Sequence, residues 1–430
     1  MAETGDRVSI EKDGKTYEGI LMPSSSNKIV LKLDSGYNIG FGSDAKITKK
    51  HGEKKEMKHA KKEKIHFDPG KKTITILHTG GTIASRVDYK TGAVTPAFEP
   101  EDLIEMYPEL KGIANIKSRL ISNMFSDDMR FAHYKIIASE IKEEIEEGCG
   151  GVIVTHGTDT MAYTSAALSF ILQDNPIPII LTGAQRSSDR GSSDAALNLI
   201  SSARFIADSD FSGVAICMHG SMSDDFCFVL SPTKTRKMHT SRRDAFRPIN
   251  DLPIAKISAN GTIEFIKKDY HKANKLRKLN LKNNFEEKVA LLKIHTNMMP
   301  EQFSFFNGYK GLVIEGTGLG HTPLDTIDDA TKIHEKIKQA IEELAKSCVI
   351  CMATQCLYGR VNMNVYSKGR NLQNMGIIPL ADMLPETAFI KLAWALGHTK
   401  DPKEVKELML RNVAGEFSER SDVRYEVGMD

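Results

Sequence analysis

Short apolar segments that alternate with amphipathic helices limit the possible folds of this chain more than any other feature. From residue 73 onward, a series of such segments consists mostly of apolar residues: TITILH, LISNMF, GVIVT, IPIILTG and GVAICM. The clearest helix between them, FAHYKIIASEIKEEIEEG, places Tyr134, Ile137 and Ile141 on one face and ends at Gly148. Short apolar strands separated by helices predict a parallel α/β sheet that is covered on both faces.

A second block of the same kind follows after a basic run. The segments VALLKI, GLVIE and CVICMA are predicted strands, and a long polar helix is expected near residues 327–346. The run at residues 266–282 contains seven basic residues and one acidic residue. We therefore predict a first α/β domain over residues 71–265, a basic connector over 266–286 and a second α/β domain over 287–430.

The N-terminal part of the chain has a different pattern. Residues 1–45 contain short strand-like segments around the turn sequences Asp13-Gly14 and Asp34-Ser35-Gly36. This pattern predicts a small β-barrel of the SH3 or Sm type, which usually serves for docking. Residues 46–70 are predicted to be a linker, because residues 46–64 hold nine Lys and three Glu with few apolar side chains.

Charge and hydropathy exclude several classes of protein. The chain has 58 Lys and Arg against 56 Asp and Glu, a net charge of +2, which excludes a protein that is basic throughout. Residues 46–64 and 266–282 each carry a net charge of +6, so the remainder of the chain carries −10. No apolar stretch reaches the roughly 18 residues of a membrane span, and the polar start MAETGDRV does not resemble a signal peptide. We expect a soluble, cytoplasmic protein without membrane contact.

The cysteines offer a possible metal or redox site. Cys348 and Cys351 form a CxxC sequence, and Cys356 follows five residues later. The pair falls in SCVICMA, however, which is typical of a buried strand whose successive side chains point to opposite faces. No second CxxC sequence or close histidine pair completes four zinc ligands. We therefore expect ordinary core thiols and no metal.

Three predicted strands end in loops that could bind a ligand. TITILH continues into residues 79–82 (TGGT), GVIVT into 156–160 (HGTDT) and PIILTG into 184–187 (AQRS). In open parallel sheets, ligands bind beyond the carboxyl ends of the strands. The glycines allow a ligand to approach the backbone closely, and the hydroxyl and carboxylate groups can project into the crevice.

Each loop also has a structural interpretation. TGGT could be a tight turn or a phosphate loop, although neither GxxxxGK[ST] nor GxGxxG is present at this loop. HGTDT could be a helix start that Thr158 or Asp159 caps. Two hydroxyl-rich loops at neighbouring strand ends favour a catalytic role over these alternatives.

A threonine hydroxyl needs a base before it can act as a nucleophile. No nucleophile elbow of a Ser-His-Asp hydrolase is visible, so the base need not be a histidine. A lysine can act as the base where burial or nearby cations lower its pKa, although a carboxylate partner raises it. The segment PTKTRKMHTSRRDAF at residues 232–246 contains candidate lysines.

The motifs TGGTIAS, THGTDTM and TGAQRSSDRGSSDA, in this order, resemble the type I/II asparaginase family of threonine amidohydrolases. The resemblance covers roughly residues 73–400 and implies an asparaginase-like fold of two parallel-sheet α/β domains. The N-terminal module and the Lys-rich segment are missing from stand-alone asparaginases. With them, the whole chain resembles the family of D subunits of archaeal glutamyl-tRNA(Gln) amidotransferases.

The resemblance implies a set of catalytic residues. Thr82 matches the nucleophile in TGGT, and Thr158 and Asp159 match the Thr-Asp pair of HGTD. The family lysine corresponds best to Lys237, with Lys234 as the alternative because the alignment is loose there.

It also implies substrate contacts. Ser126 and Asp127 match positions that hold the α-carboxylate and α-ammonium groups of the substrate, and Tyr89 would be the tyrosine of the flexible loop. Gly81, Gly157 and Ala184 would line the same site. Backbone N–H groups near Ala184 are the expected oxyanion donors.

The family further implies partners and cofactors. The chain would be a glutaminase that releases ammonia from glutamine within a ligase complex. A partner E subunit would use ATP and Mg²⁺ to activate Glu-tRNA(Gln), would hold most of the tRNA(Gln), and would receive the ammonia; this chain would need no cofactor. A homodimer core within a heterotetramer is expected.

Two other functions remain open from the sequence. A stand-alone L-asparaginase or glutaminase would share all the catalytic residues, and only the N-terminal part of the chain argues against it. A non-catalytic tRNA-binding scaffold would use the basic runs and would bind RNA in a salt-dependent way.

Overall fold

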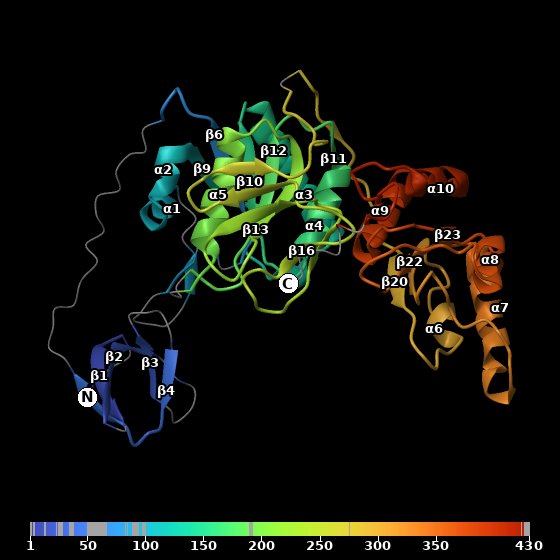
Figure 1. The fold of residues 1–430 in the computed structure, drawn as a ribbon, viewed down its shortest axis with the longest axis horizontal. Helices are drawn as coiled ribbons and strands as arrows, with labels where there is room; N and C mark the ends of the chain where they lie inside the picture. Colours follow the sequence, from blue (N-terminus) through green and yellow to red (C-terminus); the bar gives the residue numbers. More distant parts are fainter. Residues whose placement is uncertain are drawn as a thin grey trace.

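The computed structural model (Figure 1) places most of the chain in three β-sheets and their covering helices. It describes residues 2, 5–12, 14–22, 24, 29–33, 38–49, 67–81, 83, 85–87, 94–96, 100–188, 192–274, 276–422 and 424. Several positions singled out in the sequence lie outside these residues: Thr82, Tyr89, Asp13, residues 34–36 and most of the predicted linker at residues 46–70.

The N-terminal module is a five-stranded antiparallel sheet with strand order β4-β3-β2-β1-β5. Its strands are β1 (Arg7–Lys12), β2 (Lys15–Met22), β3 (Ile29–Leu33), β4 (Asn38–Phe41) and β5 (Lys46–Lys49). Val8, Ile10 and Leu31 form its small core. The predicted module is thus confirmed as a small β-unit, but its last strand lies in the range assigned to the linker. Ile47 pairs with Ile10 of β1 and packs against the core of the module. This apolar residue in the Lys-rich run therefore belongs to the sheet and not to a linker.

The larger domain is built on an eight-stranded sheet with order β18-β17-β14-β13-β12-β10-β6-β9. Its strands are β6 (Thr73–His78), β9 (Asn115–Leu120), β10 (Gly151–Thr155), β12 (Pro178–Thr182), β13 (Gly213–His219), β14 (Phe226–Leu230), β17 (Ala255–Ser258) and β18 (Ile263–Phe265). The five strands from β9 to β13 are parallel, as predicted. The last three, β14, β17 and β18, are antiparallel. Short connections join β13 to β14 and β17 to β18 as hairpins, whereas the longer segment 231–254 lies between β14 and β17. Hydrophobic content alone does not distinguish these two kinds of strand.

Helices cover both faces of this sheet. One face carries α1 (Pro100–Met106), α2 (Glu109–Ile113) and α5 (Ala195–Asp208), and the other carries α3 (Phe131–Glu146) and α4 (Met161–Ile171). Along β10, Ile153 faces one layer while Val152 and Val154 face the other. The predicted face of α3 is confirmed, since Tyr134, Ile137 and Ile141 are buried.

The segment LISNMF is not a strand, contrary to our expectation. The strand next to β6 is β9, Asn115–Leu120, whose last residue pairs with His78. Ile121 and Ser122 both donate their N–H groups to the carbonyl of His78, so the chain turns away from the sheet there. The apolar residues after Leu120 therefore belong to a strand-end loop.

The C-terminal domain has a parallel sheet, as predicted, and it contains a fourth strand, β23, beyond the three that were predicted. Its strands are β20 (Val289–Lys293), β21 (Gly311–Gly316), β22 (Val349–Thr354) and β23 (Ile378–Pro379). Its helices are α6 (Glu301–Ser304), α7 (Ile333–Ala345), α8 (Ser367–Asn374), α9 (Pro385–His398) and α10 (Pro402–Leu410), with 3₁₀ turns at Ser126–Asp128 in the larger domain and Asp329–Thr331 here. Two-residue and three-residue strands complete the structure: β7 (Ser85–Val87) with β8 (Val94–Pro96), β11 (Leu172–Gln173) with β19 (Asn280–Leu281), and β15 (Thr235–Lys237) with β16 (Phe246–Pro248).

The two α/β domains share one hydrophobic core. Helix α9 packs between the C-terminal sheet and α4, and the rings of Phe170 and Trp394 stack with centroids 5.7 Å apart. β19, within the range predicted as connector, pairs with β11 of the larger domain. After α10 the chain returns to the larger domain, where Thr233 donates its hydroxyl to the carbonyl of Ala414. Neither domain is therefore an independent unit along the sequence.

Among the described helices, none combines the length and the apolar character that a membrane span requires. The expected cytoplasmic location stays a prediction.

Candidate active site

The carboxyl ends of β6, β10 and β12 lie side by side. In the parallel register, Thr155 at the end of β10 is opposite His78 of β6 on one side and Thr182 of β12 on the other. The TGGT, HGTDT and AQRS loops therefore start at one edge of the sheet, where a ligand site is expected.

Glycines allow these loops to touch. A Cβ atom on Gly81, which has a φ of 84°, would lie 3.3 Å from the backbone nitrogen of Gly157. A Cβ atom on Gly183 would lie 2.5 Å from the carbonyl oxygen of His156 and 3.2 Å from Cγ2 of Thr158. The three loops thus pack backbone to backbone, which only glycine permits at these positions.

A lysine reaches this edge from a distant part of the chain. Nζ of Lys237, in β15, donates to Oγ1 of Thr158 at 2.9 Å and to Oδ1 of Asp159 at 2.8 Å. The Lys237 side chain is 13% exposed, whereas that of Asp159 is 71% exposed. The structure therefore brings together three of the four predicted catalytic residues, and it leaves one carboxylate face of Asp159 accessible to a ligand. Their catalytic roles stay predictions.

Lys234, the alternative lysine, lies elsewhere. Its ammonium group is buried and donates to Oδ2 of Asp382 at 2.5 Å, to Oγ of Ser418 at 3.0 Å and to the carbonyl of Asn250 at 3.3 Å. Burial lowers the pKa of Lys234, against the opposing attraction of Asp382. All three donor positions are in use, so Lys234 has a structural environment and no contact with Thr158.

The predicted substrate-binding residues lie next to HGTDT. Ser126 is buried in the 3₁₀ turn after the β9 loop, and its carbonyl accepts the hydroxyl of Thr160 at 2.5 Å. A Cβ atom on Gly157 would lie 2.8 Å from Cβ of Ser126, so the two loops are in contact. Asp127 is exposed. The structure thus places both residues beside the site and leaves the Asp127 carboxylate open to solvent.

Ala184 is half-buried at the end of β12, where it was predicted to contribute an oxyanion donor. The sequence interpretation did not identify what holds this loop. The buried carboxylate of Asp194 accepts the backbone N–H groups of Gln185 and Arg186, each at 3.0 Å. Asn198 donates to the carbonyl of Gly183 at 2.9 Å. A carboxylate before a helix is usually an N-cap, so the local sequence gives no signal of the role of Asp194 in shaping the loop.

The histidine of HGTDT has a structural role. His156 is buried, and its Nδ1 lies 2.6 Å from the carbonyl oxygen of Gly157, which can only accept a hydrogen bond. Nδ1 therefore carries the proton, and Nε2 accepts the hydroxyl of Thr164 at 2.8 Å. Burial lowers the pKa of His156 to about 4, so the ring is neutral at physiological pH. The neutral His156 ring holds the HGTDT loop in place through these two hydrogen bonds and does not act as an acid.

A pocket of about 400 Å³ adjoins the site. Thr160 forms part of its wall, together with the aromatic side chains of Phe131, Tyr163 and Phe389. Arg130 and Glu287 form an ion pair at 3.2 Å in its lining. Neither Thr158 nor Lys237 lines this pocket, so it is distinct from the place where those two residues meet.

The expected core thiols are confirmed for Cys348 and Cys351, which are both buried, while Cys356 is exposed. Burial raises the pKa of the Cys348 thiol to about 12 and that of Cys351 further. Within the described ranges, no three His, Cys, Asp or Glu side chains are grouped as metal ligands.

Comparison with protein families shows to which class of proteins this chain belongs. The model "Asparaginase, N-terminal" matches residues 73–271, "Glutaminase/Asparaginase C-terminal domain" matches residues 288–409, and "GatD N-terminal domain" matches residues 2–49. The fold is also similar to that of the thermostable L-asparaginase from Thermococcus kodakarensis, with a TM-score of 0.71 and 30% identity over 81% of this chain and 100% of that chain. A probable cytoplasmic L-asparaginase from Campylobacter jejuni gives a TM-score of 0.64 and 26% identity over 80% of this chain and 100% of that chain. The class is therefore an asparaginase-type α/β amidohydrolase with an added N-terminal module.

Relatives that match along nearly the whole chain show to which family within this class it belongs. The D subunit of the glutamyl-tRNA(Gln) amidotransferase from Pyrococcus furiosus is 51% identical over 428 residues, which are 97% of this chain and 95% of the relative. The corresponding protein from Pyrococcus abyssi is 50% identical over 427 residues, 96% and 94% of the two chains. The chain belongs to the family of glutamyl-tRNA(Gln) amidotransferase D subunits.

Proposed function

We propose that this chain is the glutaminase subunit of a glutamyl-tRNA(Gln) amidotransferase, and that it releases ammonia from glutamine with a threonine nucleophile. The observation that carries the proposal is the contact of Lys237 with Thr158 and Asp159, at the sheet edge from which the TGGT loop also starts. A lysine within 2.9 Å of a threonine hydroxyl is the arrangement that proton transfer to and from that hydroxyl requires.

The proposed reaction has two stages. Thr82 attacks the side-chain carboxamide carbon of glutamine, and its hydroxyl proton passes to the relay formed by Thr158 and Lys237. The resulting oxyanion is held by backbone N–H groups near Ala184. When the C–N bond breaks, the relay returns the proton to the leaving nitrogen and ammonia departs. Water then cleaves the Thr82 ester, which yields glutamate and restores the hydroxyl.

The residues around the relay fit an α-amino acid substrate. Asp159 is largely exposed and can pair with the α-ammonium group while it holds Lys237. We expect Ser126, whose carbonyl accepts the Thr160 hydroxyl of the HGTDT loop, to bind the α-carboxylate together with the adjacent Asp127. These contacts orient the substrate without any cofactor in this chain.

The remainder of the proposal concerns the complex. A partner E subunit would use ATP and Mg²⁺ to activate Glu-tRNA(Gln), so the assembly as a whole would be a ligase. We propose a homodimer of this chain at the core of a heterotetramer, with tRNA(Gln) held mainly by the partner. The N-terminal module supports this function over a stand-alone asparaginase, because the amidotransferase relatives match through it while the asparaginase structures cover about four fifths of the chain.

Ammonia release by Thr82→Ala and Thr158→Ala tests the chemistry. Both variants should lose hydrolysis of glutamine while their thermal stability stays near that of the wild type. Near wild-type rates in both variants would overturn the threonine mechanism.

The same assay, run with and without the partner and Glu-tRNA(Gln), tests the biological role. We expect weak glutamine hydrolysis by the isolated chain and a higher rate in the full complex. Full-rate hydrolysis of free asparagine by the isolated chain would instead indicate the stand-alone enzyme. Salt-dependent RNA binding with no hydrolysis under any condition would indicate the scaffold.

A further inference from the structure

We propose that the C-terminal domain positions Lys237, through contacts that Asp382, Thr387 and the segment 412–419 make with the residues just before it. This inference rests on the proposed function, because it assigns positioning residues to the same site. The segment concerned, residues 231–237, is called the lysine segment below. It runs from the residue after β14 to the end of β15.

The backbone of the lysine segment is held at two consecutive residues. Thr387, in the first turn of α9, donates its hydroxyl to the carbonyl of Thr233 at 2.7 Å. Ser165 of α4 donates its hydroxyl to the carbonyl of Pro232 at 2.8 Å. Both hydrogen bonds are buried, so they are protected from competition by water. The C-terminal domain and the larger domain thus each donate one hydrogen bond to the backbone of the lysine segment.

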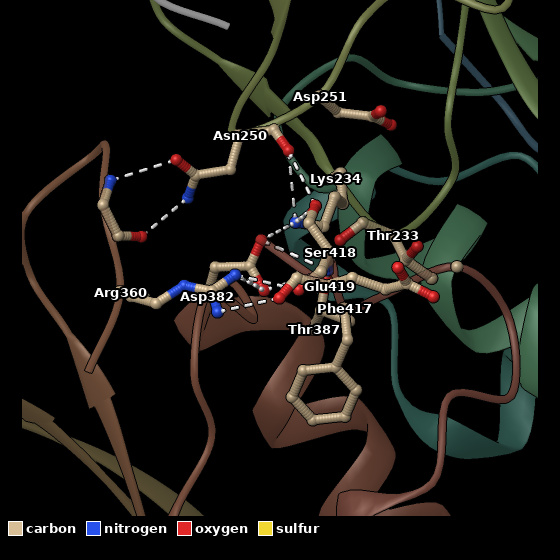
Figure 2. A network of polar contacts seen from close by, with 12 residues as sticks. Thr233, Lys234, Asn250, Asp251, Arg360, Asp382, Thr387, Phe417, Ser418 and Glu419 are labelled. Carbon is tan, nitrogen blue, oxygen red and sulfur yellow. Dashed lines mark hydrogen bonds and ion pairs between the residues drawn. The ribbon is translucent and has the colours of Figure 1, made fainter. Parts of the chain in front are cut away.

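The side chain of Lys234 provides a second anchor. It forms a buried ion pair with Asp382, and the two side chains are 1% and 2% exposed. As Figure 2 shows, Ser418 joins the same cluster: its N–H donates to Oδ1 of Asp382 at 3.0 Å, and its hydroxyl accepts from Lys234. Breaking one side of such a pair leaves an uncompensated charge in the interior. Lys234 is therefore fixed to the C-terminal domain.

The cluster is tied together around this pair. Asn250 and Gly359 exchange two hydrogen bonds of 3.0 Å. Arg360 donates to the carbonyl of Ser418 at 2.8 Å (Figure 2). The segment around Ser418 is thereby held against both domains. The hydroxyl of Thr233 adds one further bond to this segment, at the carbonyl of Ala414.

Strand geometry connects these anchors to Lys237. Within β15, successive side chains point in opposite directions, so Arg236 and Lys237 lie on opposite sides of the strand. Arg236 pairs with Glu386 of α9 at 3.0 Å, which adds a second ion pair between the lysine segment and the C-terminal domain, besides that of Lys234 with Asp382. Lys237 then faces Thr158 and Asp159. The contacts of residues 233, 234 and 236 therefore set the position from which Lys237 reaches the site.

The chemistry makes this position important. A displacement of about 1 Å at a catalytic group can reduce a rate about 100-fold, even when the cause is far from the reaction. In the proposed mechanism, Lys237 transfers protons through Thr158 and does not bind glutamine itself. Its position alone therefore does not set the affinity for glutamine. Loss of an anchor should thus lower kcat and leave KM nearly unchanged.

The test compares two variants of one hydroxyl in the full-length chain, with its partner present and glutamine as substrate. Thr387→Val removes the bond to the Thr233 carbonyl but keeps the shape of the side chain, and Thr387→Ser restores the hydroxyl. We expect kcat to fall about tenfold or more in Thr387→Val, KM to stay within about twofold, and Thr387→Ser to recover most of the rate. Thr75→Val is the matched control, because its hydroxyl is also buried but bonds to Glu144 at 2.6 Å, away from the lysine segment.

A second variant addresses the ion pair. The double substitution K234M/D382L replaces both charges with apolar side chains, which avoids leaving one charge buried and unpaired. We expect a folded protein with kcat lowered about tenfold and KM nearly unchanged.

Wild-type kcat in Thr387→Val would overturn the positioning role, and so would a loss of kcat that Thr387→Ser fails to recover or that Thr75→Val shares. Lys237→Met, measured in the same assay, separates this inference from the proposed function. If Lys237→Met hydrolyses glutamine at the wild-type rate, the proposed function itself is wrong. If Lys237→Met is inactive while Thr387→Val is normal, only the positioning role is wrong.

Discussion

The two parallel sheets of this molecule end in similar loops but use them differently. In the larger domain, the loops after β6, β10 and β12 receive Lys237 from a distant segment. In the C-terminal domain, the loops after β21 and β22 also contain glycines and hydroxyls, but hydrogen bonds join these strand-end loops to one another and to the loop after β20. Thr354 donates to the carbonyl of Gly318 at 2.7 Å, and Gln355 donates to that of Ile294 at 2.9 Å.

The comparison indicates that glycines and hydroxyls at a strand end do not by themselves produce the lysine–threonine contact on which the proposed catalysis rests. Lys293 at the end of β20 pairs with Glu315 at 3.1 Å, which resembles the pair of Lys237 with Asp159. In the C-terminal pair, however, the lysine side chain is 61% exposed and is not directed at a threonine. What distinguishes the larger domain is a lysine that is mostly shielded from water and directed at a threonine hydroxyl.

The largest expected effect comes from removing that lysine. Lys237→Met should lower the rate of glutamine hydrolysis by roughly 10²–10⁴-fold, the usual contribution of a positioned proton-transfer group. Lys293→Met, its counterpart in the other sheet, should keep a rate within about twofold of the wild type. Steady-state ammonia release measures both, and equal losses in the two variants would remove the distinction between the sheets.

The second effect is a loss of stability in acid, which should originate in the larger domain. Burial lowers the pKa of both His78 and His156 to about 4, below the ordinary value of 6.5. The unfolded chain therefore binds protons below pH 6.5 that the folded chain does not bind, so stability falls as the pH drops from about 6.5 towards 4. Each histidine should cost about 2 kcal/mol between pH 7 and pH 5.

Denaturant unfolding at the two pH values measures this loss. His78→Gln should reduce the pH dependence, whereas replacing His321 of the C-terminal domain, whose pKa burial lowers less, should change it little. An unchanged slope in His78→Gln would contradict the assignment.

The third effect concerns the glycines at the strand ends. In Gly183→Ala the new methyl group would meet the carbonyl oxygen of His156 at 2.5 Å and displace the HGTDT loop. We expect a stability loss of about 1–3 kcal/mol and at least a roughly tenfold loss of activity. Gly316→Ala, at the end of β21, meets the flexible Met352 side chain first. It should lower Tm while activity is kept; activity loss in this control would mean that both sheets support the site.

The smallest effect compares two buried threonines. Thr164→Val in α4 leaves Nε2 of His156 without its donor and should cost about 1–3 kcal/mol. The hydroxyl of Thr322 in the C-terminal domain has no hydrogen-bond partner among the described residues, so Thr322→Val should be neutral or stabilising by less than about 1 kcal/mol. Urea unfolding of both variants provides the measurement, and equal losses would show that the Thr322 hydroxyl does have a partner.

The sequence predicted the elements and loops that local patterns determine. The buried strands before TGGT and HGTDT and the apolar face of α3 follow from periodicity, and the structure confirms them. Strand direction was not predictable in the same way, because the antiparallel strand β14 (FCFVL) is as apolar as the parallel strands. The misplaced strand near Leu120 has a similar cause, since a short apolar segment can belong to a strand or to a loop that leaves the sheet.

The parts of the site that depend on contacts between distant residues were harder to predict from the sequence. Lys237 could be proposed only from the family resemblance, because nothing in its local sequence distinguishes it from Lys234 three residues earlier. Their difference arises from Asp382 and Ser418, far along the chain, which bury one lysine and leave the other directed at Thr158. Asp194 carried no signal because a carboxylate before a helix is usually a cap.

The anchoring of the lysine segment also has a consequence for the time at which activity first arises during synthesis. Thr158 and Lys237 are translated well before Thr387 and Ser418, whose contacts hold the segment in place. At about 5–20 residues per second, the ribosome needs on the order of ten to thirty seconds to add the intervening residues. A nascent chain, or one that ends early, carries the loops after β6 and β10 with a lysine segment that lacks its contacts with the C-terminal domain. Under the proposed mechanism, we therefore expect ammonia release only from the completed polypeptide.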